Sequence, residues 1–262
     1  MLQGNAIKKN NRLIYPAKPH PMYRLLVLLA FVATSCAPTY LSNSRNVPMF
    51  AEAGEFAGSV ALASGVDVQT AFSVTDNVAL MANANLVSQK ATTTDDVSYT
   101  RKNTFVEGGV GYFHRTKQRR FELFAGYGMG TRTSYESFYF FRNNVPLVAT
   151  SKYSRIFLQP SIGTNKKKFN IAATLRVSMV NFTEFKTDDP TAATPMVKPT
   201  DGIHVFIEPS LTTRFHLAGN LRGFFQLSLN QPVPDDVYYT SVPLSAAIGI
   251  QIHTGQLRTR VY

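Results

Sequence analysis

Residues Phe169–Met179 read Phe-Asn-Ile-Ala-Ala-Thr-Leu-Arg-Val-Ser-Met, the clearest alternation of apolar and polar residues in the chain. Apolar side chains stand at every odd position, whereas Asn170, Thr174, Arg176 and Ser178 stand at even ones. Successive side chains of a β-strand point to opposite faces. The stretch is therefore predicted to be a strand with one fully apolar side and one mixed side.

The same alternation recurs along the chain, and from residue 54 onward no helical period is sustained. No charged residue falls on any of the apolar faces. Ten strands with cores of about ten residues are expected, a length that suits a tilted membrane span. Because the first segment is short and rich in glycine, eight strands remain an alternative. The segments are 56–62, 66–74, 78–86, 106–112, 121–129, 156–162, 169–179, 203–211, 221–229 and 242–252.

Alternation alone does not separate a membrane barrel from a soluble barrel or sandwich, whose apolar face would point inward. The second face of each strand favours the membrane barrel, because it carries small, uncharged and bulky residues rather than many Lys and Glu. Its isolated charges are expected to pair inside a narrow lumen. The predicted fold is an all-β, antiparallel, up-and-down transmembrane β-barrel. The expected lumen charge network is Glu107, Glu122, Arg155, Arg176, Glu208, Arg214 and Arg222.

Tight and long connections alternate, which gives a topology. The tight turns are expected at 75–77, 115–120, 164–168 and 217–220, and the long loops at 89–103, 135–151, 184–201 and 231–240. Bacterial barrels have short periplasmic turns and longer external loops. The first strand must then run outward to a tight turn at Ser64-Gly65, and both chain ends are expected in the periplasm.

Charge follows the same division. Three long loops carry acidic pairs, Asp95-Asp96, Asp188-Asp189 and Asp235-Asp236, whereas two tight turns carry basic runs, at 117–120 and 166–168. The acidic pairs either bind divalent cations that bridge lipopolysaccharide or are ordinary solvated loop charge.

The amino-terminal 35 residues are interpreted as a signal peptide. Arg24 is followed by the apolar run Leu25–Ala33, which is too short for a membrane-spanning helix but matches a signal peptide core. Ala33-Thr-Ser-Cys36 resembles the bacterial lipobox, which implies acylation of Cys36. The start of translation is Met1 or Met22. An ordinary signal peptide with a chance cysteine is the alternative.

Residues 36–53 are expected to be a lipid-anchored tether, 54–254 the barrel and 255–262 a tail. Cys36 is the single cysteine, so the covalent lipid leaves no thiol for a disulfide, a nucleophile or a metal. No acidic residue follows it through Asn46. If acidic residues direct surface export, as in some lipoprotein systems, this anchor stays in the periplasmic leaflet.

Other features are less regular. Pro160 and Pro209 fall on apolar faces inside strands, where bulges are expected to accommodate them. Gly126–Gly130 is interpreted as a small-residue lumen face filled from the opposite wall. Eight aromatic residues near segment ends are expected to form interfacial girdles: Tyr112, Phe113, Phe121, Tyr153, Phe169, Phe182, Phe185 and Phe215.

The chain shows no nucleophile elbow, phosphate-binding loop, zinc motif or dinucleotide fingerprint. The architecture is similar to that of ten-stranded outer-membrane proteases, for which His204 and Asp201 would lie near the rim. Their spacing motifs are absent, so His204 is interpreted as a lumen hydrogen-bonding residue. The formal net charge of +11 falls to +6 after processing at Cys36, which argues against nucleic-acid binding.

Over residues 36–254 the chain resembles the small outer-membrane barrels of the outer-membrane-protein-A and -X type, in a lipid-anchored form. The resemblance implies location and fold but no site residues. We expect a non-enzymatic envelope protein without cofactors beyond the lipid, with outer-membrane lipids and other outer-membrane proteins as partners. A narrow pore and a lipid-tethered soluble barrel that binds a hydrophobic ligand are the alternatives.

Overall fold

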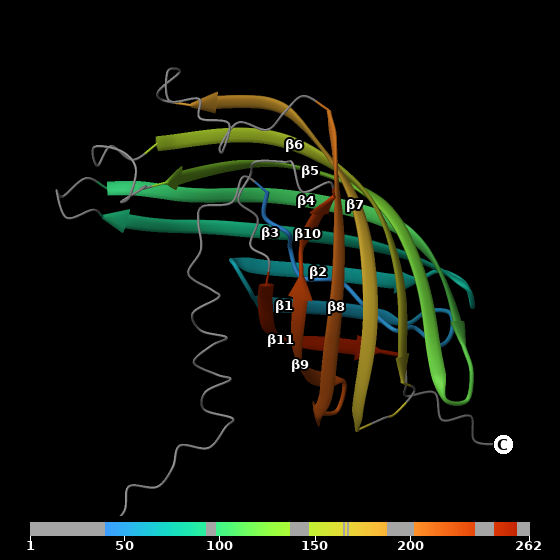
Figure 1. Cartoon of the computed structure of the whole chain (residues 1–262). Helices are drawn as coiled ribbons and strands as arrows, with labels where there is room; N and C mark the ends of the chain where they lie inside the picture. Colours follow the sequence, from blue (N-terminus) through green and yellow to red (C-terminus); the bar gives the residue numbers. More distant parts are fainter. Residues whose placement is uncertain are drawn as a thin grey trace, which may run out of the picture. The chain divides into compact units, whose positions relative to one another are not determined.

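A computed structural model describes residues 40–92, 98–136, 147–164, 166, 168–187, 202–233 and 244–255. All of them belong to one compact unit. The regular elements of this part of the chain are β-strands (Figure 1). Within the described residues, no helix is long and apolar enough to cross a membrane.

Eleven strands are described, and they differ in length by more than twofold. Four are short: β1 (Phe56–Leu62), β2 (Val66–Ser73), β9 (Leu221–Leu229) and β11 (Leu244–Thr254). Six are long: β3 (Val78–Thr92), β4 (Ser98–Arg115), β5 (Arg119–Glu136), β6 (Leu147–Thr164), β7 (Phe169–Thr187) and β8 (Ile203–Ala218). The last, β10 (Gln231–Val233), continues β9 after a break at Asn230.

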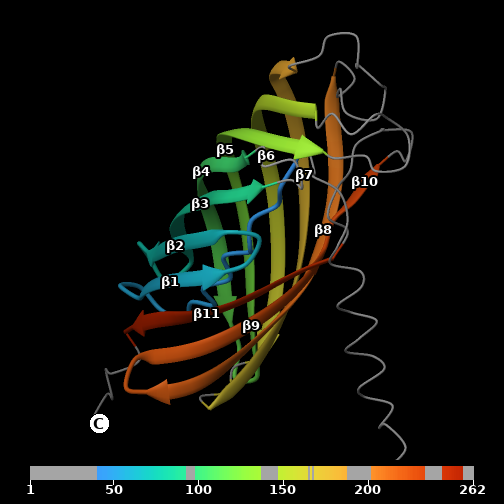
Figure 2. The same cartoon turned by 90° about the vertical axis from the view of Figure 1, so that its left-hand side faces the viewer.

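The strands close into a barrel. Each of β1 to β8 pairs antiparallel with the next, β8 pairs with both β9 and β10, and β9 pairs with β11. The pairing of β11 with β1, from Phe56↔Thr254 to Leu62↔Ile248, completes the ring. Because β9 and β10 form one wall element, the barrel has ten strands, and the expected up-and-down architecture is confirmed. The wall is tall from β3 to β8 and low at β1, β2, β9 and β11 (Figure 2).

The tight turns lie where they were expected, at residues 74–77, 116–118, 165–168 and 219–220. Three of the four long loops are shorter than expected. Between β3 and β4, for example, the strands extend to Thr92 and Ser98 and leave only 93–97. Strand pairing therefore continues beyond the end of the apolar alternation. The aspartate pairs lie outside the described residues.

The apolar faces point out of the barrel. Leu62, Ile248 and Ile156 are 63 %, 62 % and 56 % exposed, whereas Glu122 and Arg176 on the opposite faces are fully buried. This is the reverse of a soluble β-barrel, which turns its apolar face inward. Such an apolar outer surface requires lipid, so the barrel is of the transmembrane type.

The expected aromatic girdle is only half correct. Tyr112, Phe121, Phe169 and Phe215 are exposed on the outside at the tight-turn ends of their strands, as a girdle requires. Phe113 and Tyr153 are buried inside, and Phe182 packs there against a buried cluster; Phe185 is half-buried. A bulge at Lys152/Tyr153 shifts the pairing of β6 with β7. The inward positions of Phe113, Tyr153 and Phe182 need no such shift. By alternation they lie on the same side of their strands as the inward-facing Glu107, Arg155 and Arg176.

The bulges expected at the two prolines are absent. Pro160 is paired with Leu123 on β5, but the β6–β7 pairing stops at Leu158 and resumes at Ser161 without a change of register. Pro209 keeps its position opposite Leu175, and β8 pairs with β9 only from Ser210 onward. Proline lacks the N–H that the ladder needs, so each one interrupts a ladder locally.

Glycines of β5 lie under aromatic rings of the neighbouring strands. A Cβ at Gly126 would lie 2.6 Å from the ring of Phe157, its partner on β6. A Cβ at Gly128 would lie 2.5 Å from the ring of Phe105 on β4. The rings that cover this face therefore come from adjacent strands, not from the opposite wall as the sequence suggested.

Candidate functional site: a lumen filled by the amino-terminal segment

Residues 40–55, which we call the plug, occupy the lumen of the barrel. Apart from a single bridge residue at Tyr40, the segment has no regular secondary structure through Ala51, and residues 40–50 are buried throughout. An extended tether was expected over 36–53; residues 36–39 lie outside the described part of the chain, and the described residues from Tyr40 onward lie inside the barrel and not outside it. Their path inside the wall is drawn in blue in Figures 1 and 2.

Lumen side chains satisfy the backbone of the middle of the plug. Ser44 N donates to Asp67 Oδ2 at 2.8 Å, and Gln69 Nε2 donates to Ser44 O at 2.8 Å. Gln159 Nε2 donates to Asn46 O at 2.7 Å. Buried backbone groups need such partners, so the wall is equipped to hold an extended chain.

The part of the plug nearer the tight turns is held in the same way. Phe50 N donates to Glu122 Oε1 at 2.8 Å, and Arg214 and Arg120 donate to the carbonyl oxygens of Val47 and Met49. Met49 has a φ of 58°, a left-handed conformation that is unfavourable for a residue with a side chain. The hydrogen bond from Arg120 holds the chain at this bend.

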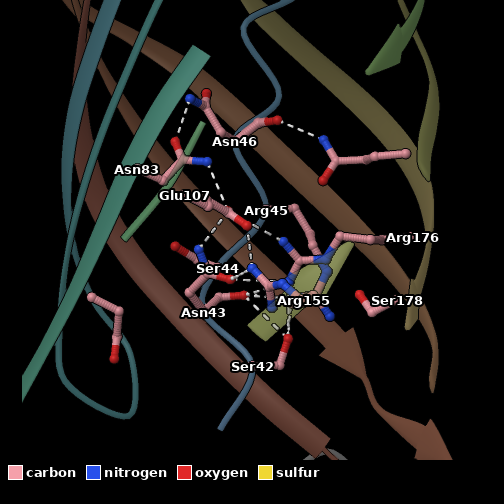
Figure 3. Close-up of polar contacts among 12 residues, drawn as sticks. Ser42, Asn43, Ser44, Arg45, Asn46, Asn83, Glu107, Arg155, Arg176 and Ser178 are labelled. Atoms are coloured by element: carbon pink, nitrogen blue, oxygen red, sulfur yellow. Dashed lines mark hydrogen bonds and ion pairs between the residues drawn. The ribbon is translucent and has the colours of Figure 1, made fainter. Parts of the chain in front are cut away.

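A cluster of charges, which we call the upper cluster, surrounds the part of the plug nearer the long loops (Figure 3). Arg155 forms an ion pair with Glu107, and Arg176 Nε lies 2.6 Å from Glu208 Oε2. Arg176 Nη1 also lies 3.6 Å from Glu107 Oε1, which joins the two pairs. All four side chains are fully buried. Without such pairing, each buried charge would be strongly destabilising.

The plug contributes its own members to this cluster. Arg45 Nη2 lies 3.4 Å from Glu208 Oε2 and donates to Asn230 Oδ1 at 2.9 Å. Asn43 Nδ2 donates to Glu107 Oε1 at 3.0 Å and its Oδ1 accepts from Arg155 Nη2 at 2.9 Å (Figure 3). The segment is thus part of the charge network, and its removal would leave several wall groups without partners.

Aromatic residues anchor both ends of the buried stretch. Tyr40 packs against Tyr153 and Phe206, with ring centroids 5.8 and 4.6 Å apart, and its hydroxyl donates to Glu208 at 3.0 Å. Phe50 packs near Phe113, with ring centroids 5.7 Å apart. Apolar contact at each end and hydrogen bonds between them fix the position of the plug along the barrel.

All seven residues of the expected lumen charge network are buried, but they lie at different levels of the barrel. Glu107, Arg155, Arg176 and Glu208 form the cluster described above. Glu122 and Arg214 lie nearer the tight turns and bind the backbone of the plug. Arg222 is buried on β9, paired in register with His216 and Gln251, and is not among the ion pairs of the upper cluster.

Sequence reasoning missed Tyr40, Asn43 and Arg45, because the segment after Cys36 was treated as a linker outside the barrel. A signal was available, since the polar run Ser42–Asn46 lies between Tyr40 and Phe50.

His204 is buried on β8 beside Phe182, with ring centroids 5.6 Å apart, which agrees with a place in the lumen. Cys36 and Asp201 lie outside the described residues.

No family model and no curated protein matches the chain. Several solved structures are similar to it, among them the following three. The translocator domain of the autotransporter NalP from Neisseria meningitidis has 9 % identity and a TM-score of 0.47, with 88 % of this chain and 94 % of that chain covered. The KdgM porin has 8 % identity and a TM-score of 0.35, with 76 % and 98 % covered. OmpT, an outer membrane protein of Vibrio cholerae, has 8 % identity and a TM-score of 0.24, with 77 % and 96 % covered.

The three neighbours are outer-membrane β-barrels. Likeness at this distance assigns no function to the chain, and the fold rests on its own strand pairing.

Proposed function

We propose that this chain is a closed β-barrel of the outer membrane with a structural or interaction role in the cell envelope, and not an enzyme. The observation that supports this best is the plug. Its backbone between Ser44 and Phe50 is bound by side chains from β2, β5, β6, β8 and β9, so it is held by five strands of the wall. The lumen is occupied by the chain's own segment, which supports a structural role and not the binding of a substrate inside the barrel.

The pore alternative is weaker for the same reason. Large side chains of the wall, among them Phe157 and Arg155, are buried together with the plug at mid-height. Ions would have to displace both. The alternative of an internal hydrophobic ligand fares worse, because the lumen at this level is lined by paired charges and amides rather than by an apolar cavity.

We further propose that lipid on Cys36 anchors the protein a second time. The partners would be outer-membrane lipids, along the apolar outer face, and other outer-membrane proteins; nucleic acid is not proposed. The carboxyl end of the described chain, at Thr254 and Gly255, lies at the tight-turn end beside the start of β1. By the loop-length rule, this end would be periplasmic.

Conductance in planar lipid bilayers tests the closed state. The mature chain is expected to be silent, and a steady open conductance would overturn the proposal. A variant with both Arg155→Ala and Arg176→Ala should also be silent, because the plug still fills the lumen. If the double variant conducts and the unchanged chain does not, the result would favour a narrow pore that is closed mainly by side chains of its wall.

Fractionation of a Cys36→Ala variant tests the double anchor. We expect it to remain in the outer membrane through alkaline carbonate washing and to migrate differently on gels with and without boiling. Incorporation of labelled palmitate should occur in the unchanged chain and be lost in the variant. A Cys36→Ala protein that is soluble in the periplasm would exclude a barrel that spans the membrane.

A further inference from the structure

The plug runs through the barrel in one direction. At its carboxyl end, residue 55 leads into β1 at the tight-turn rim, where Gly255 lies against Glu55. Toward lower residue numbers, its contacts on β6 move from Gln159 (to Asn46) to Arg155 (to Asn43) and Tyr153 (to Tyr40). This order leads from the tight-turn end of β6, Thr164, toward its long-loop end, Leu147.

The neighbouring strands give the same order. On β4, Phe113 contacts Phe50, whereas Glu107, closer to the long-loop end, contacts Asn43. On β8, Arg214 binds Val47, whereas Phe206, which again is closer to the long-loop end, packs on Tyr40. Three strands therefore agree that Tyr40 lies on the long-loop side of the rest of the plug.

The depth of Tyr40 can be estimated from the strand that it touches. Tyr153 is eleven residues from Thr164, the tight-turn end of β6. At about 3.3 Å per residue and a tilt of roughly 40°, this separation is about 28 Å along the barrel axis. The four Cα-to-Cα steps from Cys36 to Tyr40 span at most about 14 Å when fully extended. Cys36 therefore does not reach the tight-turn rim while the plug is in place.

From this geometry we infer that the plug leaves the barrel on the long-loop side and that the lipid on Cys36 enters the leaflet on that side. The inference rests on the proposed acylation of Cys36. Under the loop-length rule this leaflet is the outer one, and the partner is its lipid surface. The two ends of the mature chain then lie on opposite sides of the membrane, and the lipid-bearing segment is threaded through the barrel.

This arrangement differs from the periplasmic placement expected for the amino terminus. That expectation rested on the first strand running outward from the periplasm and on the absence of acidic residues after Cys36. The contacts of Asn43, Arg45 and Asn46 replace the tether by a segment inside the lumen. The polar residues after Cys36 then serve to bind the lumen, whatever other signal they carry.

An epitope inserted between Ala37 and Pro38 of the full chain tests the inference, with Cys36 kept. Reference tags after Asp189, between β7 and β8, and after Lys117, in a tight turn, mark the two sides of the membrane. Antibody binding is measured on intact cells and after permeabilisation of the outer membrane. We expect the amino-terminal tag to bind antibody on intact cells as the tag after Asp189 does. Binding only after permeabilisation, as for the tag after Lys117, would overturn the inference.

Palmitate labelling of the same tagged chain separates this inference from the proposed acylation. An unlabelled chain would contradict acylation of Cys36, whereas a labelled chain whose tag is hidden on intact cells would contradict only the path of the plug. If the insertion prevents folding, as judged by the gel shift on boiling, Thr39→Cys replaces it. Reaction of that thiol with a membrane-impermeant maleimide on intact cells supports the inference, and reaction only after permeabilisation contradicts it.

Discussion

Arg45 and Gln226 are joined by two reciprocal hydrogen bonds: Arg45 N donates to Gln226 Oε1 at 2.7 Å, and Gln226 Nε2 donates to Arg45 O at 3.0 Å. A side-chain amide on β9 thus satisfies both backbone groups of a residue in the plug, as a neighbouring strand would. Gln226 is held in turn by a hydrogen bond to Thr212 Oγ1 at 2.7 Å. The wall recognises the backbone of the plug at this point and not its side chain.

Gln226→Leu should loosen the plug without opening the barrel wall. The substitution leaves a buried N–H and a buried C=O of Arg45 without partners, at a cost of about 1–3 kcal/mol for each unsatisfied group. Hydrogen exchange at the Arg45 amide should become at least about tenfold faster, since each 1.4 kcal/mol corresponds to a factor of ten. Exchange in detergent micelles, read by mass spectrometry over residues 40–50, measures this.

Gln251→Leu is the matched control. Gln251 is an inward-facing glutamine on the adjacent β11 that makes no hydrogen bond to the described plug. Its substitution should leave exchange over residues 40–50 unchanged. Equal rates in the Gln226→Leu variant and the unchanged chain would contradict the hold that we assign to Gln226.

Glu107→Gln should strongly destabilise the barrel. It leaves the guanidinium of Arg155 buried with less compensating charge and also weakens the hydrogen bond from Asn43. Breaking a buried ion pair by removing one partner costs about 3–5 kcal/mol. Arg155→Met should have a similar cost. The double variant should be more stable than the sum of the two effects predicts, because the charges are removed together.

Unfolding by urea from lipid vesicles measures these free energies. Glu184→Gln on the same barrel serves as control, since Glu184 forms an exposed ion pair with Lys152 at 2.6 Å and exposed pairs contribute little. If Glu107→Gln were as mild as Glu184→Gln, the upper cluster would not stabilise the fold.

The wall of the barrel was predictable from the sequence because its pattern is local. A period of two in Phe169–Met179 fixes which side chains face lipid, and tight turns mark the ends of strands. The height of the wall was not predictable, because the ends of β3 and β4 at the long loop carry polar residues such as Lys90 and Thr100, which are paired without apolar alternation. Apolar alternation detects the part of a strand in lipid and misses the rest.

The plug was not predictable in the same way, because its apolar and polar residues follow no regular period along the sequence. Its partners lie far away in the sequence: Tyr40 and Glu208 are separated by 168 residues, and Arg45 and Gln226 by 181. The charges of the wall could be recognised as lumen residues. Nothing in their own strands indicates that a third arginine, Arg45, comes from the amino-terminal segment.

Gly126→Ala should destabilise the barrel, because the new methyl group would lie 2.3 Å from the carbonyl oxygen of Gly108 and 2.6 Å from the ring of Phe157. Overpacking of this kind costs about 1–3 kcal/mol. Gly108→Ala is the control, since its Cβ points outward and meets nothing closer than the Met81 carbonyl at 3.7 Å. Urea midpoints of the two variants should differ, and equal midpoints would mean that Phe157 moves freely off Gly126.

Leu158→Arg tests whether the outer face lies in lipid. Leu158 is 48 % exposed on the outside of β6, six residues from Thr164 and therefore about 15 Å from the tight-turn rim along the axis. This depth is close to the middle of an apolar band that is about 25 Å tall, where an arginine costs about 2–4 kcal/mol. The same change at Phe169, equally exposed but at the rim, should cost about 1 kcal/mol or less. Urea titration of folding into vesicles measures both. Equal costs at the two depths would contradict a membrane-spanning wall, because only a bilayer makes the penalty depend on depth.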